Sequence, residues 1–272
     1  MIINNMVKKL SRRKLLGSGL VSILTGCSTH AALKGDLNND GLVNGQDLAI
    51  FGANWGKADY QPPRGTIPLD SVKSLTHSNA YYLVTKDLTD IKDGFLLDDL
   101  ENITLDLGGH SIVGFGSPNS AGIYVKNCKN VNIVNGSVSG FRYAQIGFNK
   151  THNSTIADIS AHLGTNAILL TNNSNKNELV RVSVSSTDNG VSIDYDSNEN
   201  LLNRCKIGPN CWYGLKIKSS SNTGILDSEL ESNILSDIYV FGNSKNNTIL
   251  DSSTEGSSKQ SVAQNSELII GN

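Results

Sequence analysis

One short stretch near the N-terminus carries the oxygen side chains that a hard metal ion requires. In the twelve residues from 36 to 47, such side chains recur at alternate positions and a glycine stands at the sixth. Ca²⁺ takes roughly six to eight oxygen ligands, and a loop of this spacing turns alternate side chains toward one ion. An Asn- and Asp-rich turn without metal is the alternative. We predict a Ca²⁺ site formed by Asp36, Asn38, Asp40, the carbonyl of Leu42, Asn44 and Asp47.

A second set of side chains lies far along the chain, where a carboxylate, two lysines and a tyrosine recur at a spacing close to 23 residues: Asp194, Lys216, Lys218 and Tyr239. Lysines can pair with the carboxylate of an acidic sugar, an aromatic ring can stack on a sugar face, and Tyr or Lys can act as acid or base. If the chain stacks these positions, we expect a substrate-binding surface. A solvated, salt-bridged face without ligand is the alternative, and no catalytic residue is assigned.

The positions of this second set depend on an internal repeat of about 23 residues. Aligning the sequence on the pattern apolar-x-polar-small-x-apolar gives a first column of apolar residues. It consists of Leu105, Ile133, Ile156, Leu179, Leu202, Ile225 and Ile249. A second column keeps step with it, and each member is followed two residues later by another apolar residue: Ile123, Ile146, Ile168, Val191, Leu215 and Ile238. Two registers that share one period indicate a solenoid.

The apolar pairs two residues apart indicate short strands with one buried face, and Asn, Gly and Ser clusters between the columns supply turns. One coil cannot bury its apolar face alone, but stacking coils about 4.8 Å apart builds a continuous core. The 3.6-residue pattern of a helical solenoid is missing. We therefore predict an all-β fold, a right-handed parallel β-helix over residues 79–272, with outward positions at Asp194, Lys216, Lys218 and Tyr239.

The repeats resemble a known superfamily. Residues 103–112 and 136–141 are similar to the right-handed parallel β-helix repeats of pectin-lyase-like proteins. This resemblance implies the fold, and it extends to lyases, glycoside hydrolases, epimerases, tailspikes and surface proteins. The stacked carboxylates and arginine of pectate lyases and the N-T-D, D-D, G-H-G and R-I-K elements of polygalacturonases are not found together in this chain.

The calcium loop and its flanks, residues 34–57, also resemble a known module. Residues 35–44, then Asp47-Leu48 and Trp55-Gly56, are similar to one dockerin type I repeat with an EF-hand-like loop. In that family calcium-loaded repeats dock enzymes onto a cohesin or a cell-surface scaffold, which implies a cohesin-like or cell-surface partner. Dockerins usually carry two repeats and one is found here, so a calcium-stiffened spacer is the alternative. Residues 58–78 are interpreted as a linker.

Residues 1–27 are interpreted as an export signal. Basic residues between Lys8 and Lys14 precede the apolar run Leu15 to Leu24, which is too short for a permanent membrane span. Residues 11–16 resemble a twin-arginine signal, and residues 24–27 resemble a lipoprotein cleavage box that implies lipidation of Cys27. An ordinary secretory signal is the alternative. We expect an exported protein of the cell envelope or cell surface, held at the membrane by a lipid anchor.

Composition narrows the range of partners. The chain has 272 residues, a formal net charge of −2 and no basic stripe beyond the N-terminus, so nucleic acid is not an expected partner. Cys128, Cys205 and Cys211 lack the paired spacing of a zinc site and are interpreted as packed thiols, with a disulfide between the last two left open.

Three functions are consistent with these features. The leading hypothesis is a surface-anchored β-helix that binds, and in addition could process, polysaccharide beside a Ca²⁺-binding dockerin-like repeat. The second is a polysaccharide lyase or glycoside hydrolase of a carbohydrate-degrading system. The third is a structural spacer or adhesin without catalysis. The sequence leaves open whether the protein is an enzyme.

Overall fold

The computed structural model describes residues 62–209, 211–255, 260–263 and 265–271. The predicted export signal, the lipidation site at Cys27 and the predicted Ca²⁺ loop with its dockerin-like flanks lie outside these residues. Each of them therefore stays a prediction.

All regular structure in the described residues is β-strand. The strands are β1 Ile67–Leu69, β2 Ser74–Leu75, β3 Ala80–Val84, β4 Leu88–Ile91, β5 Phe95–Asp98, β6 Glu101–Asp106, β7 Ser111–Gly114, β8 Ala121–Lys126, β9 Lys129–Ser139, β10 Ala144–Asn149, β11 Thr155–Thr171, β12 Glu178–Val180, β13 Ser183–Asp194, β14 Leu201–Asn203, β15 Lys206–Ile207, β16 Tyr213–Lys218, β17 Gly224–Leu226, β18 Glu229–Glu231, β19 Ser236–Phe241, β20 Asn247–Leu250, β21 Ser253–Glu255, β22 Gln260–Val262 and β23 Leu268–Gly271. With no described helix, these residues contain no long apolar helical segment of the kind that spans a bilayer.

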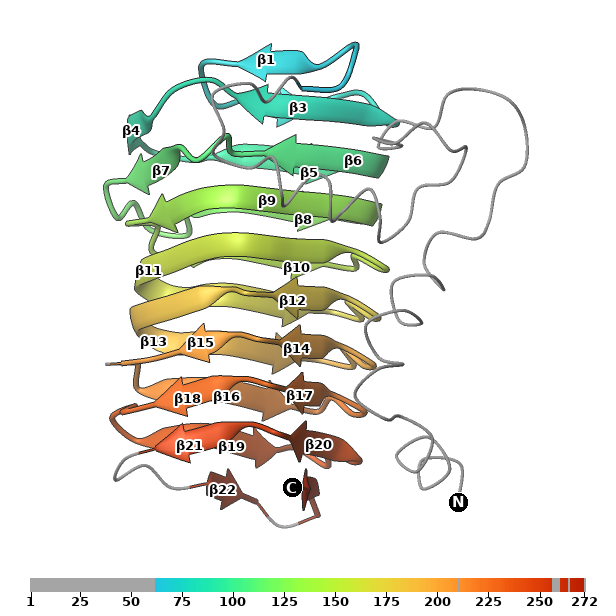
Figure 1. The fold of residues 1–272 in the computed structure, drawn as a ribbon, viewed down its shortest axis with the longest axis vertical. Coiled ribbons are helices and arrows are strands. Elements are labelled where there is room, and N and C mark those ends of the chain that lie inside the picture. The colour runs from blue at the N-terminus through green and yellow to red at the C-terminus, as the bar shows by residue number, and fades with distance from the viewer. Residues whose placement is uncertain (1–61, 210, 256–259, 264, 272) are drawn as a thin grey trace, which may run out of the picture. The chain divides into compact units, whose positions relative to one another are not determined.

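Every strand pair among the described residues is parallel, and each strand pairs with the strand one coil further along the chain (Figure 1). The coils have three faces. Face 1 contains β1, β3, β6, β12, β14, β17, β20 and β23, and face 2 contains β4, β7, β15, β18 and β21. Face 3 contains β2, β5, β8, β10, β16, β19 and β22. The long strands run through corners: β9 contributes to faces 1 and 2, β13 to faces 2 and 3, and β11 to all three faces.

The two predicted apolar columns are confirmed as in-register neighbours inside this stack. On face 1, Ile133 pairs with Ile156 and Ile156 with Leu179, and the column continues in step to Ile249. On face 3, the second column runs in register from Ile123 to Ile238. The members of both columns are buried. The predicted all-β, parallel β-helix fold is therefore correct.

A third buried column lies on face 2 and was not predicted. It consists of Ile112, Val138, Ala161, Val184, Ile207 and Leu230, which are also in register and buried. Several of these side chains are small and are flanked by serines, so their pattern is weaker in the sequence. The core is thus closed from three sides.

Buried polar ladders hold the corners between faces 3 and 1. The Oδ1 atom of Asn177 accepts a hydrogen bond from the N–H of Ser154 at 3.0 Å, and the Oδ1 atom of Asn200 accepts one from the N–H of Asn177 at 2.9 Å. A parallel serine ladder repeats the same geometry at Ser174, Ser197, Ser220 and Ser244. Each ladder satisfies backbone groups that the turn removes from the sheets.

The stack begins earlier than the predicted boundary at residue 79. Ile67 in β1 pairs with Tyr82 in β3, and Ser74 in β2 pairs with Leu96 in β5. Residues assigned to the linker from 58 to 78 thus include two strands of the β-helix. At the other end, β23 pairs with β20 and is the last strand of the described stack.

Candidate functional site

The outer surface of face 3 presents two columns of side chains that point away from the core. The first column is Leu96, Tyr124, Gly147, Leu169, Ser192, Lys216 and Tyr239. The second column is Asp98, Lys126, Asn149, Thr171, Asp194, Lys218 and Phe241. Because side chains alternate along a strand, both columns lie on the side opposite the buried column. Chemistry-bearing residues from several coils are thereby placed on one surface.

The four residues predicted to bind substrate lie together in the C-terminal half of this surface. Asp194 is directly opposite Lys218 across β13 and β16, and Lys216 is directly opposite Tyr239 across β16 and β19. The Nζ atom of Lys216 is 3.9 Å from Oδ2 of Asp194, and their side chains are 23% and 12% exposed. The structure therefore brings the predicted set into one cluster, and its role in binding stays a prediction.

The Asp194 carboxyl is largely buried although it is on the outer surface. Burial raises its pKa above the ordinary value of an aspartate, and the charge of Lys216 acts in the opposite direction. The Ser192 hydroxyl donates to Oδ1 of Asp194 at 3.1 Å and also favours the ionised form. Asp194 is thus a partly desolvated carboxyl beside an amine, which is the arrangement required of an acid or a base.

Aromatic rings lie beside the two lysines of β16, and Lys218 contacts two of them. Tyr239 is stacked between Tyr213 at a centroid distance of 5.2 Å and Phe241 at 4.6 Å. The Nζ atom of Lys218 lies 4.7 Å from the ring centroid of Tyr195 and donates a hydrogen bond to its hydroxyl at 3.2 Å. Planar rings beside amines form a surface on which a sugar ring can stack while its anionic group meets a cation.

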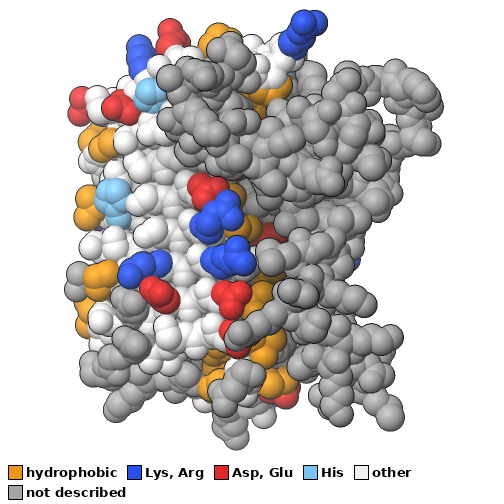
Figure 2. Space-filling view, in the orientation of Figure 1, with side chains coloured by type: hydrophobic (Ala, Val, Ile, Leu, Met, Phe, Trp, Pro, Cys, Tyr) orange, Lys and Arg blue, Asp and Glu red, His pale blue; other side chains and the backbone are white. Residues whose placement is uncertain are grey.

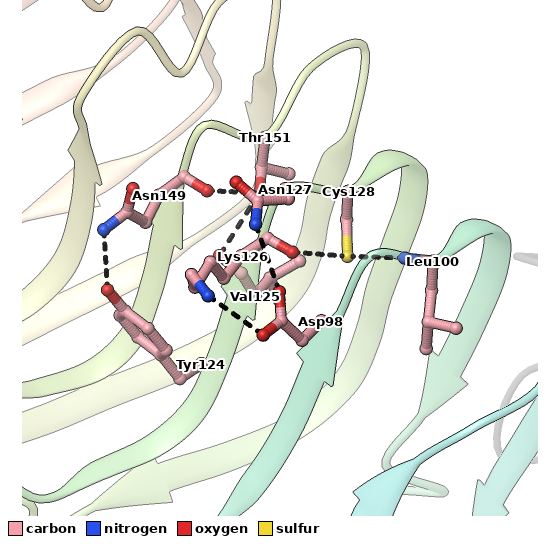
Figure 3. Close-up of polar contacts among 9 residues, drawn as sticks. All are labelled: Asp98, Leu100, Tyr124, Val125, Lys126, Asn127, Cys128, Asn149 and Thr151. Atoms are coloured by element: carbon pink, nitrogen blue, oxygen red, sulfur yellow. Dashed lines mark hydrogen bonds and ion pairs between the residues drawn. The ribbon is translucent and has the colours of Figure 1, made fainter.

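The N-terminal half of the surface is electrically balanced (Figure 3). The Nζ atom of Lys126 is 3.0 Å from Oδ2 of Asp98, and Asn149 donates a hydrogen bond from Nδ2 to the Tyr124 hydroxyl at 2.8 Å. Tyr143 packs edge-on against Tyr124 at a centroid distance of 6.5 Å. Burial raises the pKa of the Tyr143 hydroxyl, with smaller effects from Tyr124 and Asp194. The excess positive charge of the surface is therefore at the two lysines of β16.

The three described cysteines have structural roles. All three are free and buried, so the disulfide left open between Cys205 and Cys211 is not formed. Cys128 accepts a hydrogen bond from the N–H of Leu100 and donates to the carbonyl of Lys126 (Figure 3), in the position that serines occupy on later coils. Burial raises the pKa of the Cys205 thiol to about 11. Burial therefore keeps the Cys205 thiol protonated and unreactive at neutral pH.

Solved structures with the same fold are known. A variant of the periplasmic alginate epimerase AlgG is 13% identical, with a TM-score of 0.56 over 81% of this chain and 52% of that chain. The DFA-IIIase of Arthrobacter chlorophenolicus A6 without its lid is 13% identical, with a TM-score of 0.53 over 85% of this chain and 70% of that chain. This chain spans about half the length of the epimerase. At these identities the likeness establishes the fold, a right-handed parallel β-helix.

The search of curated proteins found no match. The sequence model of one protein family, described as "Periplasmic copper-binding protein (NosD)", matches residues 77–266, which is more than half of the chain. Those residues correspond closely to the coil stack.

The side chains of the described residues decide whether this chain could hold the copper named in that description. Copper sites use thiolate, thioether or imidazole ligands that converge on one point. Within the described ranges, no three His, Cys, Asp or Glu side chains converge in this way. Cys128 and Cys205 donate instead to backbone carbonyls within the corners. The described residues therefore do not fit a copper ion, although by its match over the coil stack the chain belongs to the family described as periplasmic copper-binding protein (NosD).

Proposed function

We propose that this protein binds an acidic polysaccharide on the outer surface of face 3. The observation that carries the proposal is the placement of Lys216 and Lys218 on one strand, beside the stacked rings of Tyr213, Tyr239 and Phe241. An acidic polysaccharide presents a carboxylate and a ring face at regular intervals. This surface offers amines for the first and aromatic rings for the second.

The charge distribution favours an anionic ligand. Lys126 is neutralised by Asp98, whereas Lys216 and Lys218 share the single carboxyl of Asp194, whose pKa is raised by burial. The cluster therefore keeps a net positive charge near neutral pH. A structural neighbour that acts on alginate, a polymer of acidic sugars, is consistent with this choice of ligand. A spacer or adhesin without ligand would have no reason to maintain a stacked aromatic surface around two cations.

Polysaccharide processing is the second candidate, as a lyase, an epimerase or a glycoside hydrolase. The observation that favours it is the partly desolvated Asp194 beside Lys216, because a carboxyl whose pKa is raised by burial holds a proton more readily than an exposed aspartate, as a general acid must. Incubation with uronate and neutral polysaccharides, followed by absorbance of unsaturated products and by new reducing ends, tests this candidate. Product on either readout establishes an enzyme, and its absence with retained binding leaves a binding protein.

The proposal extends to the cellular setting. We propose that the protein is exported and lipid-anchored through Cys27 in the cell envelope, which agrees with the periplasmic description of its family. We also propose that the loop ending at Asp47 binds Ca²⁺, and that the dockerin-like repeat contacts a cohesin-like or cell-surface partner. The resulting protein would hold polysaccharide at the envelope.

Removal of both lysines is expected to weaken polysaccharide binding. We expect the double variant Lys216→Ala/Lys218→Ala to bind an acidic polysaccharide such as alginate about 30-fold more weakly, because the contacts of two partly exposed charges contribute about 1 kcal/mol each. Affinity electrophoresis or calorimetry at low salt measures the effect. The control Lys176→Ala/Lys206→Ala removes the same charge from other surfaces, where these lysines pair with Glu199 and Glu229, and should bind as the wild type does. Equal weakening in both variants would contradict the assignment to face 3.

Calcium binding is expected to depend on the N-terminal loop. The double variant Asp36→Ala/Asp40→Ala should lose one bound Ca²⁺ per chain, because it removes two anionic ligands from a site that needs several oxygens. Isothermal titration with Ca²⁺ on chelator-treated protein measures the loss. The control Asp188→Ala/Asp196→Ala lies in the coil stack and should titrate like the wild type. An unchanged titration in the loop variant would remove the assignment.

A further inference from the structure

The corner between faces 2 and 3 is hollowed along the axis of the coils. One hollow of about 460 Å³ is lined by residues that include Arg142, Thr165, Ser186, Thr187, Asp188 and Trp212. A neighbouring hollow of about 360 Å³ is lined by Pro118, Asn119, Arg142, Tyr143 and Thr165. The two hollows share Arg142 and Thr165, so they form one groove that crosses successive coils. We call this feature the corner groove.

The corner groove has a rigid floor. The N–H of Thr165 donates to the carbonyl of Arg142 at 3.0 Å, and the N–H of Trp212 donates to the carbonyl of Thr187 at 3.2 Å. The buried Gln145 side chain donates from Nε2 to the carbonyls of Phe141 and Leu163 at 2.8 and 2.9 Å. These bonds tie each corner to the next, so the groove is already formed before any ligand arrives, which lowers the entropic cost of binding.

Two side chains at the rim can recognise a sugar that carries a carboxylate, Trp212 and Arg142, and the carboxyl of Asp188 beside them can accept hydrogen bonds only from sugar hydroxyls. Trp212 is 54% exposed, although an indole ring gains free energy when its apolar surface is covered. Arg142 is also exposed, and in the described part of the chain no hydrogen bond or ion pair engages its guanidinium. A guanidinium can bind a carboxylate through two parallel hydrogen bonds. Hydroxyl groups of Thr165 and Ser186 line the wall between them.

We propose that the corner groove is a second binding site for an oligosaccharide that contains uronic acid. Trp212 stacks on one sugar ring, and Arg142, three coils away along the groove, binds the carboxylate of a sugar about three units further along the ligand. Successive coils are about 4.8 Å apart, which is close to the length of one pyranose unit, so a chain that follows the groove meets equivalent positions on each coil. The ligand class rests on the proposed function, but the groove is a separate surface with its own residues.

The corner groove adjoins face 3 at two points. Tyr143 lines the second hollow and also packs against Tyr124 of face 3. Trp212 directly precedes Tyr213, whose ring stacks on Tyr239. A single polysaccharide could therefore contact the aromatic stack of face 3 and the groove together, which would raise its overall affinity through two linked sites.

A protein contact is the competing explanation for this corner. Figure 2 shows hydrophobic side chains along one edge of the coil stack, and Leu163, Ile234 and Leu235 at corners between faces 2 and 3 are all more than half exposed. An apolar ridge of this kind can also mark a protein interface. The unengaged guanidinium and the hydroxyl-lined hollow favour a polar, anionic ligand, and the experiment below distinguishes the two.

Fluorescence of Trp212 reports directly on the corner groove. The chain has two tryptophans, so the full-length variant Trp55→Phe leaves Trp212 as the only one. We expect a uronic-acid hexasaccharide to change the Trp212 emission saturably, and a neutral hexasaccharide of the same length to have at least a tenfold weaker effect. In the same background, Arg142→Gln should weaken the response about tenfold, and Arg204→Gln, an exposed arginine outside the groove, should leave it unchanged.

The Lys216→Ala/Lys218→Ala variant separates this proposal from the proposed function. A Trp212 response that persists in that variant supports an independent groove site. No response to any saccharide, while alginate still binds through face 3, overturns the groove and leaves the proposed function intact. If Trp212 does not respond and alginate does not bind, both the groove site and the proposed function are overturned. An equal response to the neutral hexasaccharide overturns the acidic ligand class. An emission shift that depends only on protein concentration overturns the groove site in favour of contact between copies of the chain.

Discussion

Truncation of Phe148 to alanine is expected to lower the free energy of unfolding by about 3 to 5 kcal/mol. The Phe148 ring is fully buried in the inner column of face 3, between Val125 on the preceding coil and Leu170 on the following coil. The coils above and below are held at a fixed spacing by hydrogen bonds, so they cannot collapse into the cavity. The midpoint and slope of a urea denaturation curve, followed by far-ultraviolet circular dichroism, measure the loss.

Phe115→Ala is the matched control for this prediction. It makes the same chemical change at a side chain that is 59% exposed, where little packing is lost, and should change the free energy of unfolding by less than about 0.5 kcal/mol. A comparable loss in both variants would mean that burial inside the coils is not the source of stability. A small loss at Phe148 would mean that the stack tolerates a cavity.

The fold was predictable because the strand register of a solenoid appears in the sequence as a repeat of constant length. Ile146, Ile168 and Val191 recur at a nearly constant interval, and that interval is the length of one coil, so sequence neighbours at this spacing are spatial neighbours. The start of the stack was missed for the same reason. Ile67 pairs with Tyr82 after only 15 residues, a shorter coil than the period that was extrapolated backwards. A terminal coil that departs from the repeat cannot be found by its period.

The residues of the candidate site that lie on regular strands were predictable from the sequence, and those that lie at corners were not. Asp194, Lys216, Lys218 and Tyr239 are at outward positions of β13, β16 and β19, so alternation and period place them together. Sequence reasoning could not show that Asp194 is largely buried, because burial depends on the side chains around it. The missed residues are at or beside turns, where alternation breaks down: Tyr213, Arg142 and Trp212. Their only sequence signal is an aromatic or cationic residue within a turn.

The polar ladders also repeat once per coil, and the asparagine ladder is interrupted at one position. Asn177, Asn200 and Asn247 accept hydrogen bonds through Oδ1 from backbone N–H groups of the preceding coil. Thr223 occupies the equivalent position between the last two, and its hydroxyl has no partner although it is buried. The shorter side chain fails to reach the backbone groups that an asparagine would satisfy. The contribution of the ladder to stability can therefore be tested in two ways, by removing an asparagine from it and by adding one at Thr223.

Replacement of Asn177 with alanine is expected to lower the free energy of unfolding by about 2 to 6 kcal/mol. The change leaves the N–H of Ser154 and the carbonyl of Thr151 without their hydrogen bonds inside a buried corner, at about 1 to 3 kcal/mol for each group. Asn132→Ala, at an exposed position on face 1, should change stability by less than about 0.5 kcal/mol. Urea denaturation measures both variants under the same conditions.

Thr223→Asn makes the opposite change and should raise the free energy of unfolding by about 1 kcal/mol. The new Oδ1 would accept from the N–H of Asn200, and the new Nδ2 would donate to the carbonyl of Ser197, as Asn200 does toward Ser174 one coil earlier. A gain at Thr223 together with a loss at Asn177 would show that the ladder stabilises each coil on the next. Because both proposed binding surfaces need side chains from several coils at fixed spacing, that stacking is also what holds Asp194, Lys216 and Tyr239 in one site. A loss in both variants would instead show that the corner at Thr223 is shaped for the smaller side chain.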